Sequence, residues 1–312
     1  MADSTVTETS LEGFRRVIYP VPGGAMAGIA FGAATPNPDI VFLHATGFNA
    51  RTYRALLQPL GDRFHVLALD ARGHGRTQLK ARTFGYTSWR RHRDDLIALL
   101  ERHFAQPVTL AGHSMGATVS LLAAGRRPDL VRSLALIDPV ILPAVGYALS
   151  ELPFAPMINR HVFSLARKAV NRRRRFPSRE AAIEAFTNRG VFKAFPREMI
   201  EDYVANGLVD TPSGHVKLAC HPKYEAATFC AQRNDPWAAL RAYDGPLVLL
   251  RAERQSTIRQ AAAHRIAALR PSARVATIEG AGHMLPMERP DRVRAAIEAA
   301  ALMAGDRRHD DL

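Results

Sequence analysis

A serine between two glycines, in residues 112–116 (Gly-His-Ser-Met-Gly), is the part of this chain that points most directly to chemistry. An apolar run, 107–111, precedes it, and a run suited to a helix, 117–125, follows it. This context predicts a nucleophile elbow, a sharp turn that holds a serine hydroxyl exposed at the end of a strand. Glycines suit a place where strand and helix pass too close for side chains. We therefore predict that Ser114 is a covalent nucleophile.

A serine hydroxyl needs a neighbouring base, and histidine most often supplies it. Of the twelve histidines, His283 is the best candidate. It follows a strand-like run and lies in a loop of small residues, 280–282, that can approach the edge of a sheet. His113 lies inside the elbow but is expected to point away from the site, because neighbouring residues of a strand face opposite sides.

Secondary-structure elements must position these residues. Strand-like and helix-like runs alternate along the chain, which predicts a mostly parallel sheet flanked by helices. The alternation stops in residues 141–235, which resemble helices separated by prolines. We expect an α/β core domain made of residues 1–140 and 236–312. Residues 141–235 are then a helical lid over the carboxyl ends of the strands, where ligands bind in open α/β sheets.

The expected strands are 17–19, 28–31, 39–44, 65–70, 108–113, 131–138, 246–253 and 274–279. The expected helices of the core are 51–60, 88–104, 260–269 and 291–303. Thr87 or Ser88 is expected to cap the second of these helices, because hydroxyl side chains accept hydrogen bonds from the first free amides of a helix.

Length and composition bound the remaining possibilities. The chain has 312 residues, of which 47% are hydrophobic, so it can bury a sizeable core. No apolar run approaches 18 residues, and the first ten residues are polar, so we expect neither membrane insertion nor a secretory signal. Cys220 and Cys230 are expected to be free thiols, which fits a cytoplasmic protein. The sequence leaves the oligomeric state open.

The chain is strongly basic, with 42 Lys and Arg against 29 Asp and Glu, a net charge of +13. This charge favours acidic partners, and seven of the basic residues lie in the short segment 167–179. We find no signature of a nucleic-acid-binding module, so DNA and RNA are not expected as partners. The cysteines lack metal-ligand spacing and no phosphate-binding glycine loop is present, so we expect no metal and no cofactor.

Four motifs, in this order, resemble those of the α/β-hydrolase superfamily. They are the turn after the third strand (residues 44–47, His-Ala-Thr-Gly), the loop after the fourth (70–75, Asp-Ala-Arg-Gly-His-Gly), the elbow (112–116), and the loop that carries the histidine (280–286, Gly-Ala-Gly-His-Met-Leu-Pro). The resemblance covers nearly the whole chain and points to the lidded branch of esterases, lactonases and C–C-bond hydrolases. It implies an α/β-hydrolase fold with a helical lid.

The resemblance also implies roles for further residues. In this fold the oxyanion hole consists of the backbone N–H after the nucleophile and a second N–H from the turn after the third strand. In this chain the first donor is the amide of Met115 and the second is the amide of Thr46. Ala45 replaces the usual glycine of that turn. His44 and His74 match motif histidines that hold loops together.

The acid that should orient His283 is not where the superfamily usually has it. After the strand 246–253 the sequence continues Arg254-Gln-Ser-Thr257, without the expected aspartate. Some members place the acid one strand earlier, which here is Asp138 and keeps the order Ser, acid, His. Glu253 is the alternative, and a chain without a working acid is the third possibility.

A serine nucleophile implies acyl-enzyme chemistry, so the expected substrate is a small-molecule carboxylic ester or lactone. An apolar acyl group is favoured by the scatter of Phe and Met in the lid segment: Phe154, Met157, Phe163, Phe186 and Phe192. The alternatives are a C–C hydrolase or a perhydrolase-type relative, and a catalytically weak ligand-binding protein that keeps the fold.

Overall fold

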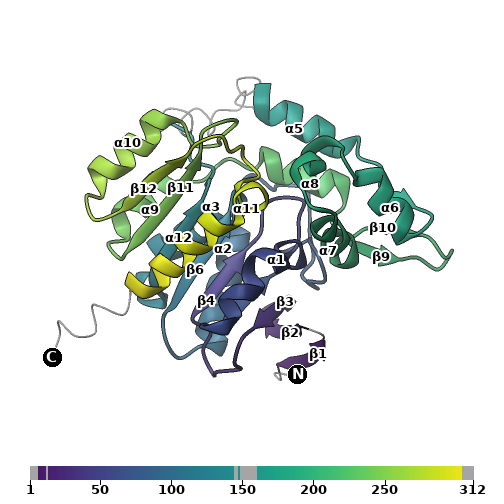
Figure 1. The fold of residues 1–312 in the computed structure, drawn as a ribbon, viewed down its shortest axis with the longest axis horizontal. Coiled ribbons are helices and arrows are strands. Elements are labelled where there is room, and N and C mark those ends of the chain that lie inside the picture. Colours follow the sequence, from purple (N-terminus) through teal and green to yellow (C-terminus); the bar gives the residue numbers. More distant parts are fainter. Residues whose placement is uncertain (1–5, 12, 144–146, 148–159, 304–312) are drawn as a thin grey trace.

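A nine-stranded sheet forms the centre of the molecule in the computed structural model, which describes residues 6–11, 13–143, 147 and 160–303 (Figure 1). The strand order is β1-β2-β3-β5-β4-β6-β7-β11-β12. Antiparallel pairing joins β1, β2, β3 and β5, and every pairing from β5 to β12 is parallel. The predicted mostly parallel sheet is confirmed. The strands are β1 Thr7–Leu11, β2 Phe14–Val21, β3 Gly24–Phe31, β4 Ile40–Leu43, β5 Val66–Leu69, β6 Val108–His113, β7 Val131–Ile137, β11 Leu247–Ala252 and β12 Arg274–Ile278.

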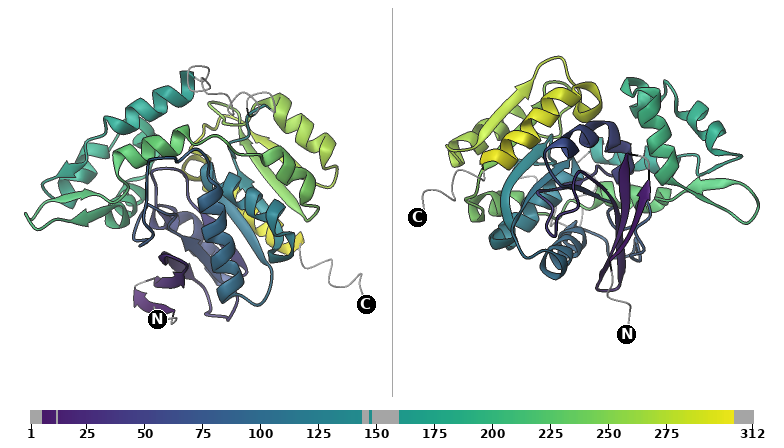
Figure 2. Two further views of the ribbon diagram at one scale, coloured as in Figure 1. Left: turned by 180° about the vertical axis from the view of Figure 1, so that it is seen from behind. Right: turned by 60° about the horizontal axis from the view of Figure 1, so that its bottom comes forward.

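Helices cover both faces of the sheet, because the buried strands are apolar on both sides. In β4, Val41 and Leu43 pack into the cluster that contains α2, α3, α9 and α10, while Ile40 and Phe42 pack on the other face against α1 and α12. Figure 2 shows these two layers from behind and from below. The helices are α1 Arg54–Leu57, α2 Arg90–His103, α3 Met115–Arg126, α9 Pro236–Ala242, α10 Gln260–Leu269, α11 Leu285–Glu288 and α12 Pro290–Met303, with the 3-10 turns η1 Ala50–Tyr53, η2 Gln58–Asp62 and η3 Pro128–Leu130.

The segment 160–235 lies beside the carboxyl ends of the parallel strands, at the upper right of Figure 1. The sequence predicted helices here, and the structure has four of them, together with a three-stranded sheet that the sequence did not predict. Strands of two or three residues are too short to show alternation, which explains the omission. The elements are α5 Arg160–Val170, β8 Arg175–Phe176, α6 Arg179–Phe186, η5 Gly190–Ala194, α7 Arg197–Gly207, β9 Leu208–Asp210, β10 Val216–Leu218 and α8 Pro222–Cys230. The division of the chain into core and lid stays a prediction.

Two of the expected helices differ from the prediction by more than one residue. The predicted helix 51–60 is divided into η1, α1 and η2, and Pro59 lies at the start of η2, where the missing N–H of proline is tolerated. The helix expected from residue 88 begins at Arg90, and its N-cap residue is Trp89, without a side-chain cap. Burial of the indole overrides the preference for a hydroxyl cap, since Trp89 is fully buried in the core. Within the described ranges, no helix is long and apolar enough to cross a membrane.

Candidate active site

Ser114 lies at a sharp turn between β6 and α3, as the elbow motif predicts. Its backbone has φ 55° and ψ −116°, a conformation that residues with a side chain seldom adopt. The flanking glycines leave room for this turn: a Cβ on Gly112 would lie 2.5 Å from the carbonyl carbon of Gly116, and one on Gly116 would lie 2.2 Å from the carbonyl oxygen of Leu43. The start of α3 therefore touches the end of β4, and the turn after β4 lies beside Ser114.

His283 joins Ser114 to Asp138 by hydrogen bonds. Its Nε2 lies 3.0 Å from Ser114 Oγ, and its Nδ1 lies 2.6 Å from Asp138 Oδ2. The ionised carboxylate can only accept, so Nδ1 carries the proton and donates it. In the neutral imidazole Nε2 is then bare and accepts the hydrogen bond of the serine hydroxyl. The side chains come from three separate loops at the carboxyl ends of the sheet strands, after β6, β7 and β12.

Asp138 is fully buried, and its environment keeps it ionised. Burial alone would raise its pKa, but the hydrogen bond and charge of His283, with bonds from Ser256 Oγ (2.6 Å) and the Ala252 amide (2.9 Å), outweigh burial and lower the pKa. The amide of Thr257 donates to the second carboxylate oxygen at 3.2 Å. Asp138 itself has φ 43°, so both it and Ser114 are held in strained conformations.

The alternative acid, Glu253, does not contact His283. Its carboxylate accepts the amide of Gly280 at 2.8 Å, on the exposed side of the loop. The hydroxyls of Ser256 and Thr257 lie where the sequence lacks the usual acid, and they donate to Asp138 instead. The sequence did not predict these two residues as partners of Asp138. Two adjacent hydroxyl residues at the position of the missing acid could have indicated this role.

The turn 44–47 after β4 is held on several sides. The amide of Ala45 donates to Tyr53 Oη (3.1 Å), and the amide of Gly47 donates to His74 Nε2 (3.0 Å). In the described part of the chain the amide of Thr46, between them, has no hydrogen-bond acceptor, and neither does that of Met115 at the start of α3. Both predicted oxyanion donors are therefore without a partner inside this part of the protein.

Two buried histidines fix this turn as neutral side chains. His44 Nδ1 donates to the Ala45 carbonyl (2.7 Å), and its Nε2 accepts the Ala71 amide (2.9 Å). His74 Nδ1 donates to the Arg72 carbonyl (3.0 Å). Burial lowers the pKa of His44 well below its usual value and that of His74 to about 4. Each ring thus has one donor and one acceptor nitrogen, which its partners require.

The segment 160–235 reaches the same turn through a partly buried ion pair. Arg172 Nη1 lies 2.7 and 2.8 Å from the two oxygens of Glu225, and its Nη2 donates to Tyr203 Oη at 2.7 Å. A Cβ on Gly47 would lie 2.5 Å from Glu225 Oε1. Only glycine fits there, both for that reason and because φ is +82°.

The aromatic residues expected to line a pocket are only partly described. Phe154 and Met157 lie outside the described residues, as does the side chain of Phe163. Phe186 and Phe192 lie in an aromatic cluster with Phe48, next to the turn 44–47, and the ring centroids of Phe48 and Phe192 are 6.1 Å apart. Packed aromatic side chains therefore lie next to the turn 44–47.

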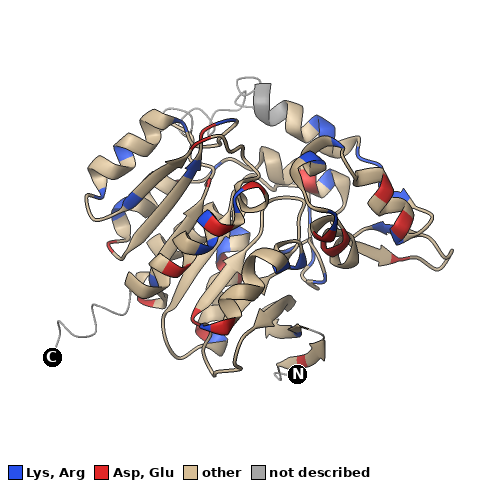
Figure 3. Ribbon diagram, in the orientation of Figure 1, with Lys and Arg blue, Asp and Glu red and all other residues tan. Residues whose placement is uncertain are grey.

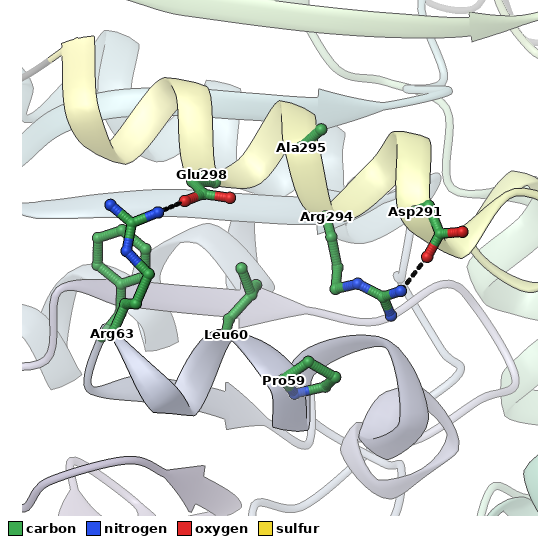
Figure 4. A pocket seen from close by; sticks show the side chains of 8 residues that line it. Pro59, Leu60, Arg63, Asp291, Arg294, Ala295 and Glu298 are labelled. Atoms are coloured by element: carbon green, nitrogen blue, oxygen red, sulfur yellow. Dashed lines mark hydrogen bonds and ion pairs between the residues drawn. The ribbon is translucent and has the colours of Figure 1, made fainter.

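A pocket of about 270 Å³ lies elsewhere, between η2 and α12 (Figure 4). None of Ser114, Asp138 and His283 lines it. Its charged side chains pair with each other, Arg63 with Glu298 and Arg294 with Asp291. Among the residues the structure describes, no group of three or more His, Cys, Asp or Glu could hold a metal ion.

Comparisons with known proteins agree with this architecture. The model of the "Alpha/beta hydrolase family" matches residues 40–296. The chain is 29% identical over 261 residues to the 2-(acetamidomethylene)succinate hydrolase of Mesorhizobium japonicum, covering 84% of this chain and 87% of that protein. It is 27% identical over 271 residues to an sn-1-specific diacylglycerol lipase of Mus musculus, covering 83% and 80%.

Solved structures show the same fold. The crystal structure of E-2-(acetamidomethylene)succinate hydrolase superposes with a TM-score of 0.75 at 24% identity, over 92% of this chain and 98% of that one. The thioesterase domain from the curacin biosynthetic pathway superposes with a TM-score of 0.69 at 16% identity, over 94% and 99%. These likenesses show the fold alone. Since the family model spans most of the sequence, this chain belongs to the alpha/beta hydrolase family.

Proposed function

We propose that this protein is a serine hydrolase that cleaves a carboxylic ester or related acyl bond through an acyl-enzyme intermediate on Ser114. The observation that carries the proposal is the hydrogen-bonded series from Ser114 Oγ through His283 to Asp138, with 3.0 and 2.6 Å between the heavy atoms. Nucleophile, base and orienting acid in this order are the requirements of acyl transfer.

In the first half-reaction, Ser114 Oγ attacks the carbonyl carbon while His283 Nε2 takes the hydroxyl proton. Asp138 stabilises the imidazolium that results. The oxyanion of the tetrahedral intermediate accepts hydrogen bonds from the amides of Met115 and Thr46, each worth roughly 3–4 kcal/mol of transition-state stabilisation. The positive end of α3 adds to this stabilisation. His283 then gives the proton to the leaving group as the carbon–leaving-group bond breaks.

In the second half-reaction, water replaces the leaving group. His283 Nε2 takes a proton from the water as its oxygen attacks the acyl carbon, and the same two amides hold the second oxyanion. The bond to Ser114 Oγ breaks, the proton returns to that oxygen, and a carboxylic acid leaves. We propose that residues 141–235 form a lid over this site and that the aromatic cluster around Phe48 favours an apolar acyl group.

An amide bond in an acidic substrate is the second candidate. It is favoured by the net charge of +13 and by the relative whose name is 2-(acetamidomethylene)succinate hydrolase. Lys and Arg lie on the sheet-flanking helices as well as on the segment 160–235 (Figure 3). The positive charge of such a protein raises the rate at which anionic substrates encounter it, and added salt weakens this effect.

Turnover of p-nitrophenyl esters of rising acyl length tests the proposal, with wild type and Ser114→Ala side by side. We expect turnover by the wild type alone, with an optimum that measures the acyl pocket. N-acetyl enamine dicarboxylates test the second candidate, for which kcat/KM should fall as salt rises. Equal rates for wild type and Ser114→Ala on every ester and amide would contradict a serine hydrolase and favour a ligand-binding protein.

A further inference from the structure

We infer that Tyr53 and His113 are positioning residues that tie the oxyanion turn to the loop carrying His283. This inference rests on the proposed function. Tyr53 is the last residue of η1, and His113 is the last residue of β6. Neither side chain bonds to Ser114 or to the amides of Thr46 and Met115.

Three hydrogen bonds form one continuous series. The amide of Ala45 donates to Tyr53 Oη at 3.1 Å, Tyr53 Oη lies 2.8 Å from His113 Nδ1, and His113 Nε2 lies 2.8 Å from the carbonyl oxygen of His283. Ala45 precedes Thr46, whose amide is the proposed oxyanion donor. One end of the series therefore holds the oxyanion turn, and the other holds the backbone of the proposed base.

Chemistry fixes the direction of every bond in the series. The His283 carbonyl can only accept, so His113 Nε2 carries the proton. Burial lowers the pKa of His113 to about 3, so the ring is neutral near pH 7 and its Nδ1 is bare. Tyr53 must then donate to Nδ1, and its oxygen accepts the Ala45 amide. Reversing the bond between Tyr53 and His113 would leave a bare Nε2 against the His283 carbonyl, with two buried acceptors facing each other.

The series passes beneath the elbow and is shielded from water. Tyr53 is 1% exposed and His113 is fully buried. The imidazole rings of His113 and His283 have centroids 5.0 Å apart, so the two rings also pack against each other. Catalytic groups must be held to within about 0.5 Å of their productive geometry. Here the hydrogen-bonded pair of Tyr53 and His113 sets the distance between the turn with the oxyanion donor and the loop with the base.

Tyr53→Phe tests this role, because it removes one oxygen and keeps the ring. The Ala45 amide then loses its acceptor and His113 Nδ1 loses its donor. We expect kcat on a p-nitrophenyl ester to fall at least 10-fold, with KM changed less than 3-fold, because positioning acts on the transition state. Tyr243→Phe, at another buried tyrosine, is the control and should keep the wild-type kcat. Unchanged kcat in Tyr53→Phe would overturn the inference.

Substitutions at His113 give a second test. Its glutamine variant keeps a side-chain N–H able to reach the His283 carbonyl, whereas leucine keeps only the bulk. We expect His113→Gln to retain at least 5-fold more kcat than His113→Leu. Adding Tyr53→Phe to His113→Leu should cost little more, because the series is already broken. Equal kcat for His113→Gln and His113→Leu would show that the two residues act only through packing. The same conclusion would follow if the losses of Tyr53→Phe and His113→Leu multiplied in the double variant.

The outcomes separate this inference from the proposed function. If the wild type shows no Ser114-dependent turnover, the proposed function fails, and the inference fails with it. If the wild type is active and Tyr53→Phe matches it, the inference alone fails. Thermal unfolding of each variant shows whether a loss of kcat reflects a loss of folded protein.

Discussion

At the scale of single residues, Asp138 is the side chain whose role is most sharply testable. It accepts hydrogen bonds from His283, Ser256 and two backbone amides, and these keep it ionised in spite of burial. Asp138→Asn replaces an acceptor by an amide, so His283 loses the partner that keeps its proton on Nδ1. We expect kcat to fall by about 10³- to 10⁴-fold, as in a serine protease whose aspartate is so replaced. Steady-state kinetics on a p-nitrophenyl ester measures it.

Glu253→Gln is the matched control, since Glu253 is the nearest alternative acid by sequence and its carboxylate accepts the Gly280 amide, away from His283. We expect its kcat to remain within about 3-fold of wild type. A large loss in Glu253→Gln together with a small loss in Asp138→Asn would show that the acid has been misassigned. Circular dichroism of both variants excludes unfolding as the cause.

At the scale of elements, the partly buried pair of Arg172 and Glu225 links the segment after α5 to α8, next to the oxyanion turn. Arg172→Met leaves the Glu225 carboxylate buried, beside Gly47 and without a countercharge. We expect the free energy of unfolding to fall by about 3–5 kcal/mol, because the change strands the charge of the buried Glu225. Arg172→Met with Glu225→Gln should recover part of this loss. Urea denaturation measures both.

The exposed pair Arg179–Asp210 provides the control within the same segment. Exposed ion pairs contribute roughly 0–1 kcal/mol, so Arg179→Met should change the free energy of unfolding by less than about 1 kcal/mol. Equal losses for Arg172→Met and Arg179→Met would contradict the proposed difference between them. Failure of Glu225→Gln to improve Arg172→Met would show that Arg172 acts through packing rather than charge.

At the scale of the whole molecule, buried neutral histidines make the fold sensitive to acid. Burial lowers the pKa of His74 to about 4 and that of His92 and His113 to about 3. Below about pH 6.5 the unfolded chain therefore binds more protons than the folded one, and each histidine lowers stability by about 1.4 kcal/mol per pH unit. Asp70 opposes them, because burial raises its pKa to about 6 and the folded chain keeps that proton.

These three histidines, together with His44, outweigh one aspartate, so the free energy of unfolding should fall by about 2 kcal/mol or more per pH unit below pH 6. Urea denaturation at pH 8.0, 7.0, 6.5 and 5.5 measures it. We expect nearly equal values at pH 8.0 and 7.0 and a steep loss below 6.5. His92→Leu should make the fall of the free energy of unfolding with pH less steep, by about the contribution of one histidine. Equal stability at pH 8.0 and 5.5 would contradict this account.

The sequence predicted most of the sheet, because buried parallel strands are continuous apolar runs. It predicted α10 with its observed bounds, and also the elbow turn, whose two glycines are dictated by close backbone approach. It did not predict the small sheet of β8, β9 and β10, which is too short to show a period. Nor did it predict the contacts of Tyr53, since hydrogen bonds between residues 60 positions apart leave no local pattern.

The covalent reaction of Ser114 tests the central claim most directly. The protein is treated with a fluorophosphonate, its intact mass is measured, and the labelled peptide is sequenced, with Ser114→Ala in parallel. We expect one label per chain, located on Ser114, and no label on the alanine variant. Folded wild-type protein that stays unlabelled, or a label that persists in Ser114→Ala, would contradict the claim that this site is a serine nucleophile.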